Sequence, residues 1–483
     1  MFMELAIEEG GERLRFTSSR FGSCTETAWF LHGRGEFLAP PIIDADLTDP
    51  ETLLIRFADG HTATLHENDL DPQGPADRII RNIGQLVRHD EQGRFRVEED
   101  AEIWIRAGRI LDAGPRRDIL ARRGLAPAET PVLDARGAVV SAGLVDPHTH
   151  PVFAGERSRE FAMRKAGATY AEIQAAGGGI LSTMRATRAA SIDELLAGAV
   201  MRLHRMASFG VTSVEGKTGY ALDAEGEMRM LRVLRSLSSR CAVDVSPTLL
   251  AAHIVPPEYA ANRTAWVDCI VQDLIPQSAK TAVAVDVFCE HNAYTLEETV
   301  RILEAARAAG LHTRVHAGQF SSLGAAAAAA RLGALSADHL ECVSEEEFSA
   351  LAAARTTVAV LLPGAALSLG MNPPSGRAFL DRGIPVAVGT DCNPGTSMTE
   401  NLPLCGTLAC MQMGLTVEET WSAMTLHAAR AAGFPDRGNL FPGAPADLVI
   451  WNFSHYGVLA YHFGVSHVRT LLRRGIEVQL ASR

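Results

Sequence analysis

The feature that most constrains the fold is a repeated alternation of short apolar segments with longer helical ones. Parallel strands need helical crossovers, and about eight such units close into a barrel. We therefore expect an α/β chain built around a (β/α)8 TIM-like barrel. The predicted strands lie within 144–153, 210–220, 242–253, 282–290, 311–319, 333–341, 356–364 and 384–395.

Helix starts support this alternation. The segments "TLEETVRILEAARAAG" and "SEEEFSALAAAR" have helical patterns. Thr295 or Thr299 in the first, and Ser344 in the second, stand where a capping oxygen is preferred. The run Ala325–Ala330 predicts a closely packed helix face.

The two ends of the chain predict further β structure. Residues 1–75 form an extra β-rich segment of unknown role, with a hairpin signal at Asp59-Gly60 and the linker "DPQGPAD" after it. Strand-like sequence also occurs in residues 76–140 and 436–483. These two segments predict the two parts of a small composite β-sandwich domain. The barrel would then occupy residues 141–435.

Polar residues stand where the predicted barrel strands end, which is the active-site face of such barrels. One buried histidine at a strand end is most often a core residue. Five histidines and an aspartate converging on one rim favour a metal site instead. These strand-end residues are His148, His150, Lys217, His253, His316, His339 and Asp391.

The pair in "DPHTH" gives the metal hypothesis its geometry, because residues i and i+2 of a strand point to the same side. His148, His150, His316 and Asp391 are ligands suited to one divalent or trivalent ion, zinc or iron, with a position left for water. Such an ion lowers the pKa of bound water towards ~7 and polarises a carbonyl. Asp391 could also take the proton of the water, and His339 could stabilise an oxyanion or shuttle protons. We expect hydrolysis of a C–N bond.

Composition excludes some partners and locations. The formal net charge of -12 argues against nucleic acid or an anionic membrane as partner. The eight cysteines contain no C-x-x-C pair, which favours reduced thiols. The N-terminus lacks a secretory pattern, and the apolar run at 356–371 is interrupted by Pro363 and marginal for a membrane span. We expect a cytoplasmic protein.

The chain resembles the amidohydrolase superfamily and, more closely, its imidazolonepropionase family, over about residues 80–483. The resemblance rests on "DPHTHPVFAGERSREF", "GATYAEIQAAGGGILSTMRATR", "VEGKTGYALD", "AAHIVPPEY", "VDVFCE", "ALSADHLE", "TDCNPGTS" and "YHFGVSHVRTLLRRG". Residues 1–75 have no counterpart in that family.

The resemblance implies a single metal ion held by the four ligands above, without a carbamylated lysine. It implies that Arg157, Tyr220 and His253 contact the substrate, a small cyclic amide with a carboxylate tail. It also implies that Asn393, Gly395 and Thr396 hold the product end. A homodimer is the expected assembly.

The activity that the resemblance implies is ring opening of 4-imidazolone-5-propanoate to N-formimidoyl-L-glutamate, a step of histidine degradation. Metal-bound hydroxide would attack the ring carbonyl while His339 and Asp391 handle protons. Gln319, the third predicted catalytic residue, can orient substrate or water but cannot act as a base.

Departures from the family pattern leave open which ring the substrate has. Gly318 stands where an acidic residue is usual, Cys392 where an aromatic residue is common, and 365–368 are small. A hydantoin- or thiohydantoin-type propionate is therefore an alternative substrate. A deaminase is less favoured, because Gln319 replaces the glutamate of an H-x-x-E turn.

Alternatives from other classes remain open. The barrel could be a metal-stabilised scaffold, with residues 1–75 binding a partner. Arg157 could form a surface ion pair, and Tyr220 could be a core aromatic. Lys217 is expected to pair with a nearby carboxylate, and a carbamylated ligand is the less favoured interpretation.

Overall fold

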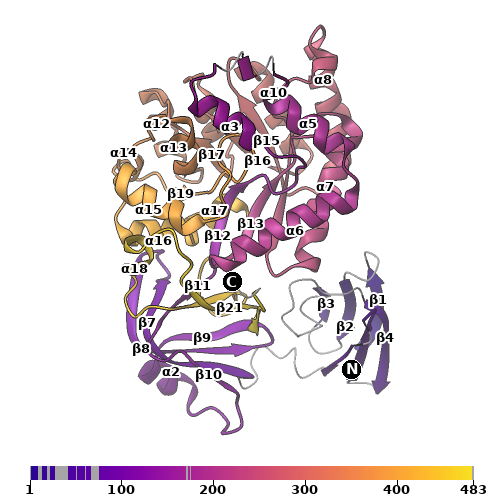
Figure 1. Ribbon diagram of the computed structural model, residues 1–483. Helices are drawn as coiled ribbons and strands as arrows, with labels where there is room; N and C mark the ends of the chain where they lie inside the picture. The colour runs from indigo at the N-terminus through magenta and orange to yellow at the C-terminus, as the bar shows by residue number, and fades with distance from the viewer. Residues whose placement is uncertain are drawn as a thin grey trace.

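The computed structural model describes residues 2–8, 13–18, 22–27, 42–49, 52–59, 61–66, 76–169, 172–173 and 176–480. Its centre is an eight-stranded parallel sheet in chain order, which confirms the predicted barrel (Figure 1). Backbone bonds from His150 N to Cys392 O, 3.1 Å, and from Asp391 N to His148 O, 3.0 Å, join the first strand to the segment after the last. The strands are β12 (Leu144–Thr149), β13 (Val211–Lys217), β14 (Asp244–Ala252), β15 (Ala284–Cys289), β16 (His312–Ala317), β17 (Ser336–His339), β18 (Val358–Leu361) and β19 (Val386–Val388).

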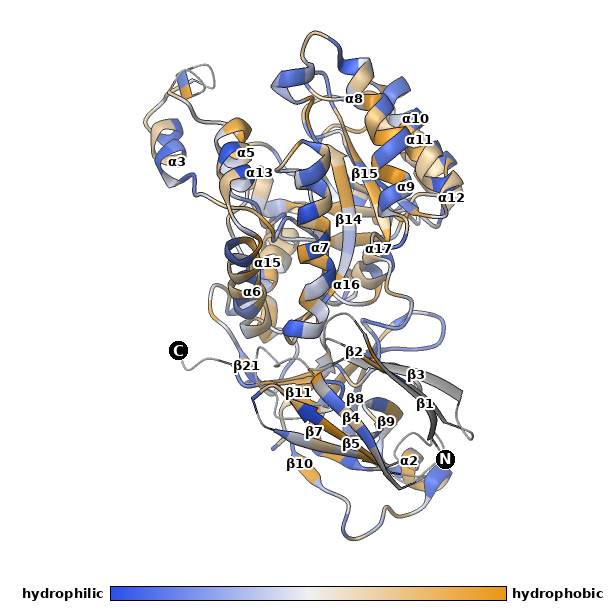
Figure 2. Cartoon of the chain, turned by 90° about the vertical axis from the view of Figure 1, so that its right-hand side faces the viewer, coloured by the Kyte–Doolittle hydropathy of each residue, from blue (hydrophilic) through white to orange (hydrophobic). Residues whose placement is uncertain are grey.

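Helices surround this sheet, and Figure 2 shows apolar barrel strands such as β14 and β15 enclosed by helices that also carry hydrophilic residues. The helices are α3 (Ser158–Lys165), α5 (Ile180–Ala189), α6 (Ile192–Ser208), α7 (Ala224–Arg240), α8 (Arg263–Cys269), α9 (Ile275–Ser278), α10 (Leu296–Ala308), α11 (Ala325–Arg331), α12 (Glu345–Ala354), α13 (Pro363–Leu369), α14 (Gly376–Leu380), α15 (Leu402–Met413), α16 (Val417–Ala423) and α17 (Leu426–Ala432).

The local sequence explains several of these helices. Thr295, not Thr299, caps α10, and Ser344 caps α12, each in a capping box with the glutamate three residues later. All six alanines of Ala325–Ala330 are buried on α11, as predicted, because their small side chains let the helix pack closely.

A second sheet joins segments from both sides of the barrel. The long strand β7 pairs in parallel first with β10 and then with β11, and β11 pairs antiparallel with β20 near the C-terminus. This confirms the composite β domain, as one sheet of order β22-β21-β20-β11-β7-β8-β9 with its own apolar core. Its strands are β7 (Arg78–His89), β8 (Phe95–Arg106), β9 (Arg109–Pro115), β10 (Val132–Asp134), β11 (Val139–Ala142), β20 (Leu448–Trp451), β21 (Val468–Arg473) and β22 (Ile476–Glu477), with the helices α2 (Arg116–Arg123) and α18 (Val458–Tyr461) beside them.

The N-terminal segment forms two antiparallel three-stranded sheets, β1-β2-β3 and β4-β5-β6. The predicted hairpin is β5 paired with β6, where Asp59 Oδ1 accepts a hydrogen bond from His61 N, 2.9 Å. Gly60 and most of the linker lie outside the described residues. The strands are β1 (Phe2–Glu8), β2 (Arg13–Ser18), β3 (Gly22–Thr27), β4 (Ile42–Asp49), β5 (Thr52–Phe57) and β6 (Thr62–His66).

The apolar run at 356–371 folds as β18 and α13. Throughout the described parts of the chain, every helix is too short or too polar to cross a membrane. The domain boundaries at residues 75, 140 and 435 stay predictions.

Candidate metal centre and adjoining cavity

The carboxyl ends of β12, β16 and β17 and the turn after β19 bring four histidines and an aspartate together. Ligand atoms of His148, His150 and His316 lie within 4.8 Å of one another, as do those of His148, His339 and Asp391. Asp391 Oδ1 lies 3.4 Å from His148 Nε2 and 3.6 Å from His150 Nε2. All these side chains are buried, so the sequence prediction of one converging cluster is correct.

The backbone at this cluster is unusual. Asp391, His339 and Leu340 have φ values of 53°, 78° and 67°, in the left-handed region that non-glycine residues rarely adopt. Asp146 holds the neighbouring turn, because its carboxylate accepts hydrogen bonds from Thr390 N, 3.1 Å, and Thr390 Oγ1, 2.6 Å. The strained backbone is therefore tied down by buried hydrogen bonds.

The histidine nitrogens test whether a metal ion fits. His148 Nδ1 lies 2.6 Å from Asp338 Oδ2, which directs His148 Nε2 towards Asp391. That Nε2 is buried and has no hydrogen-bond partner among the described residues. An unsatisfied buried nitrogen costs about 1–3 kcal/mol, and a metal ion would satisfy it. Carboxylates behind ligating histidines are a common feature of metal sites.

Lys217 organises the carboxylates behind the histidines. Its Nζ lies 3.0 Å from Glu215 Oε1, 2.7 Å from Asp286 Oδ2 and 3.6 Å from Asp338 Oδ2, and all four side chains are fully buried. Asp286 Oδ2 in turn lies 3.0 Å from His316 Nδ1. The prediction that Lys217 pairs with a carboxylate is confirmed, and its ammonium is fully engaged in ion pairs.

Burial sets the charge of the histidines. Desolvation lowers the pKa of His148 and His150 well below the ordinary value and lowers the pKa of His316 to about 4, which favours the neutral form that metal ligands need. Burial raises the pKa of Asp391 to about 6. The pKa of His339 is raised, because attraction to the carboxylates of Glu341, Asp391 and Asp338 outweighs desolvation.

Tyr220 and His253 flank the cluster on the His150 side. The His253 ring stacks on His150 at 5.5 Å between centroids, and the Tyr220 ring lies 5.4 Å from that of His253. His253 Nδ1 lies 3.0 Å from Gly219 O. The structure thus brings both predicted substrate-contacting residues next to a predicted ligand.

The loop that carries Tyr220 is fastened by Glu227, which sequence reasoning missed. The Glu227 carboxylate accepts hydrogen bonds from Gly219 N, 2.9 Å, Ala221 N, 2.9 Å, and Leu222 N, 2.8 Å, and is fully buried. An available signal was its position on the apolar face of a helix, three residues before Met230 and four before Leu231.

Arg157, which is predicted to bind substrate, forms an ion pair with Glu160. Its Nε and Nη2 both lie 2.8 Å from Glu160 Oε2, and Glu160 Oε1 accepts a hydrogen bond from Ser182 Oγ, 3.1 Å. The side chain is 15% exposed, which is less than a surface ion pair would show. A Cβ on Gly395 would lie 2.5 Å from Arg157 Nη1, so Gly395 admits the guanidinium.

Asn393, Gly395 and Thr396 bond to one another and to Asp391. Asn393 Oδ1 accepts from Gly395 N and Thr396 N, both 2.8 Å, and Asn393 Nδ2 donates to Asp391 O, 2.7 Å. Thr396 Oγ1 donates to Asp391 Oδ2, 3.2 Å. This turn therefore leaves Asp391 Oδ1 facing the histidines.

One departure from the family pattern, Gly318, has a structural explanation. Gly318 has φ +66°, and a Cβ there would lie 2.4 Å from Cys342 O, so this turn accepts only glycine. Cys392 is fully buried, as are Ala365 and Ala366 to within 1%. Gln319 follows Gly318 and is 6% exposed, close behind the predicted ligand His316.

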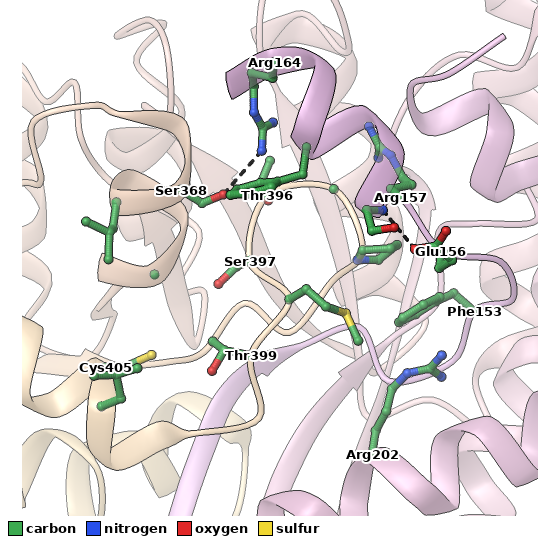
Figure 3. Close-up of a pocket in the computed structure, with 18 of the residues that line it drawn as sticks. Phe153, Glu156, Arg157, Arg164, Arg202, Ser368, Thr396, Ser397, Thr399 and Cys405 are labelled. Carbon is green, nitrogen blue, oxygen red and sulfur yellow. Dashed lines mark hydrogen bonds between the residues drawn. The ribbon is translucent and has the colours of Figure 1, made fainter. Parts of the chain in front are cut away.

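A cavity of about 640 Å³ lies beside the turn that follows Asp391 and is lined by Pro394, Gly395 and Thr396 of that turn (Figure 3). Three predicted substrate or product residues line it: Arg157, Gly395 and Thr396. Of the small segment 365–368, only Leu367 and Ser368 reach the cavity.

Comparison with known proteins gives the family. A model of the Amidohydrolase family matches residues 174–463, more than half of the chain. The chain is 43% identical over 408 residues to an imidazolonepropionase of Myxococcus xanthus, covering 83% of this chain and 96% of that protein. It is 46% identical over 347 residues to an imidazolonepropionase of Paracidovorax citrulli, covering 71% and 83%.

The chain belongs to the imidazolonepropionase family of amidohydrolases. Family membership together with the histidine–aspartate cluster supports a requirement for a divalent metal ion. Among solved structures, a guanine deaminase from C. acetobutylicum superposes with a TM-score of 0.63 at 14% identity, covering 83% of this chain and 100% of that chain. An adenosine deaminase from Xanthomonas campestris gives 0.60 at 20% identity, covering 83% and 93%. These two likenesses concern the fold alone.

Proposed function

We propose that the chain opens the ring of 4-imidazolone-5-propanoate by hydrolysis to give N-formimidoyl-L-glutamate. The observation that carries this proposal is the buried His148 Nε2, which has no hydrogen-bond partner among the described residues and faces Asp391 Oδ1 together with His150 Nε2. The relatives named imidazolonepropionase, at 43% and 46% identity, support it.

The proposed metal ligands are His148, His150, His316 and Asp391. When bound there, a zinc or iron ion supplies polarisation of the ring carbonyl and acidification of a water molecule. Asp338 and Asp286 orient the imidazoles of His148 and His316. Lys217 holds both carboxylates in place, so the ligands are arranged before the ion arrives.

Protons move through Asp391 and His339 in this proposal. Asp391 accepts the proton of the attacking water at a carboxylate oxygen and delivers it to the ring nitrogen as the C–N bond breaks. The His339 imidazole, with Glu341 Oε2 3.8 Å from Nδ1, stabilises the negative charge that develops on the carbonyl oxygen. The Gln319 amide orients the ring and takes no proton.

The remaining proposed roles concern binding. Arg157 binds the propionate carboxylate through its Nη1 side, since Glu160 occupies Nε and Nη2. Tyr220 and His253 pack against the ring, and Asn393, Gly395 and Thr396 hold the product end.

No specific observation favours a hydantoin- or thiohydantoin-type substrate. The positive φ of Gly318 explains the glycine at this position without reference to the substrate. The relatives named imidazolonepropionase support 4-imidazolone-5-propanoate as the substrate. The homodimer and the cytoplasmic location expected from the sequence stay proposals.

A turnover assay of metal-quantified protein tests this function. It follows the loss of 4-imidazolone-5-propanoate absorbance, with the hydantoin and thiohydantoin analogues alongside. We expect turnover of the imidazolone that is lost in Arg157→Ala protein with full metal content. Metal-loaded protein that hydrolyses only an analogue would contradict the proposed substrate.

A further inference from the structure

The cavity of about 640 Å³ beside the metal cluster has mainly apolar walls. Phe161 of α3, Leu367 of α13 and Met398 of the turn after β19 line it and are 48%, 54% and 54% exposed. Its opening therefore presents apolar surface to small molecules in solution.

Three cationic side chains on these walls form no ion pair with a carboxylate in the described parts of the chain, although the charge of Glu400 acts on Arg202. Arg164 Nη2 donates to Ser368 Oγ at 3.4 Å, Lys165 Nζ donates to Ser368 O at 3.2 Å, and Arg202 Nη1 donates to Pro151 O at 2.8 Å. Among the described residues, none of the three forms an ion pair with a carboxylate.

The arginines are also partly desolvated. Arg164 Nε is buried with no hydrogen-bond partner among the described residues. The Arg202 guanidinium lies 3.5 Å above the centre of the Phe153 ring, and burial lowers its pKa. Cations in apolar surroundings attract an anion more strongly than cations in open water do.

The charge of the cavity is opposite to that of the chain. The chain has a formal net charge of -12, yet the cavity lining contains four cationic residues and one acidic residue, Glu156. Glu160 neutralises the charge of Arg157. Three positive charges then remain on the lining against the one negative charge of Glu156: those of Arg164, Lys165 and Arg202. The cavity thus concentrates positive charge on an acidic protein.

The cavity is connected to the metal cluster through residues on its wall. Thr396, on its wall, donates a hydrogen bond to Asp391, and Arg157 enters beside Gly395. Figure 3 shows Arg164 and Arg157 on the same segment above the turn that carries Thr396, with Arg202 beside Phe153 below it.

We propose that this cavity is a capture site for small carboxylate anions that have an apolar part. Arg164, Lys165 and Arg202 attract the carboxylate, the apolar walls hold the rest of the molecule, and the anion then passes to Arg157. This inference rests on the proposed function, because it gives the carboxylate substrate a route to the metal cluster.

The kinetic test compares Arg164→Gln/Lys165→Gln with wild-type holoenzyme at low and high salt. Both residues are at least partly exposed, so the fold is not at risk. We expect kcat/KM at low salt to fall about fivefold or more with kcat unchanged, and its salt dependence to become flatter. Arg159→Gln is the matched control, because Arg159 lies on the same helix, is exposed and does not line the cavity.

A binding test is independent of turnover. Calorimetric titration of metal-loaded protein with 3-phenylpropionate, which the enzyme cannot hydrolyse, measures capture directly. We expect binding to be about tenfold weaker in the double variant, a difference of about 1.4 kcal/mol, and unchanged in Arg159→Gln. Neutral 3-phenylpropionamide should bind weakly to all three proteins.

Two outcomes would overturn the capture site. One is unchanged affinity in the double variant with loss of binding only in Arg157→Ala, which would place the probe at Arg157 alone. The other is an equal effect of Arg159→Gln, which would mean that only total charge matters. Probe binding that depends on Arg164 and Lys165, in protein that does not turn over the imidazolone, would refute the proposed function and leave the capture site standing.

Discussion

Both ends of the barrel bury charged and polar side chains, but the partners of these side chains differ between the two ends. At the end with the metal cluster, His148 Nε2 has no hydrogen-bond partner among the described residues, and Asp391 and His339 adopt left-handed backbone conformations. At the opposite end, Arg473 and Arg437 both pair with Asp244, the first residue of β14. Arg473 belongs to β21, so this cluster fastens the barrel to the composite sheet.

The contrast separates function from stability. The unsatisfied His148 nitrogen and the strained backbone of Asp391 and His339 cost free energy, which a bound ligand can offset. The paired charges of Arg473, Arg437 and Asp244 instead fix how the barrel packs on the composite sheet. This division agrees with barrel enzymes in general, whose active sites lie at the carboxyl ends of the strands.

The largest effect is expected at the cluster. In Asp391→Ala the position that faces both His148 and His150 is empty, so kcat/KM should fall by about 10³-fold or more. Metal content measured by elemental analysis should fall below one ion per chain, while circular dichroism stays that of wild type. Full activity in this variant would remove Asp391 from the proposed mechanism.

The opposite end should respond in stability instead. In Arg473→Met the buried Asp244 loses a partner, and the free energy of unfolding should fall by about 3 kcal/mol, measured by urea denaturation of metal-loaded protein. Arg469→Met on the same strand is the control: it removes a hydrogen bond to Ala135 O, 2.6 Å, but leaves no buried carboxylate without a partner, so it should cost clearly less. A large loss of kcat in the folded protein, with stability unchanged, would reverse the comparison.

A pH effect should also arise at the composite sheet. His89 on β7 is buried, lies 2.9 Å from Ser422 Oγ of α16, and desolvation lowers its pKa from 6.5 to about 4. As the pH falls, His89 becomes protonated in the unfolded chain near pH 6.5 but in the folded protein only near pH 4. The neutral, buried His89 therefore contributes its full stabilisation above pH 6.5, and this stabilisation is lost as the pH falls towards 4.

The full loss from His89 is about 3 kcal/mol, and about 1 kcal/mol of it should appear between pH 7.5 and 5.5. His89→Gln cannot titrate, so its free energy of unfolding should depend less on pH than that of wild type over this range. Equal pH dependence in the two proteins would exclude the assignment.

A smaller effect on activity than that of Asp391→Ala is expected where the cluster meets its loops. In Glu227→Gln the side-chain amide N–H would face backbone N–H donors and loosen the loop that carries Tyr220. His253 would also be affected, because its Nδ1 lies 3.0 Å from Gly219 O of that loop. We expect kcat/KM to fall about 10- to 100-fold, consistent with hydrogen bonds to a charged group of about 1.5–3 kcal/mol. Metal content should not change, and the exposed Glu225→Gln on the same helix turn should behave as wild type.

A double-mutant cycle sharpens this test. If Glu227 acts by placing Tyr220, then Glu227→Gln should cost little more activity once Tyr220→Phe is present. Additive losses would mean that Glu227 stabilises the fold without positioning the site.

The sequence was sufficient to predict the barrel and the convergence of the histidines and Asp391 on one rim. Eight apolar segments of strand length, each followed by a helical pattern, have few ways to bury their surface other than a closed parallel sheet. Because parallel strands end on one rim, His148, His150, His316 and Asp391 were expected to converge before any coordinate was known. The capping oxygens of α10 and α12 were predictable for the same local reason, although Thr295 and Thr299 could not be told apart.

The tertiary structure alone decided which polar groups are satisfied. Glu227 reaches Gly219, Ala221 and Leu222 only because α7 packs back on its own preceding loop. Lys217 of β13 meets Asp286 of β15 and Asp338 of β17, which are not adjacent strands, only because the sheet closes into a barrel. The gathering of Arg164, Lys165 and Arg202 around one cavity likewise joins two separate helices, α3 and α6. Such contacts depend on how elements pack in three dimensions, whereas strand periodicity and chain order, which fix the barrel and its rim, are written locally in the sequence.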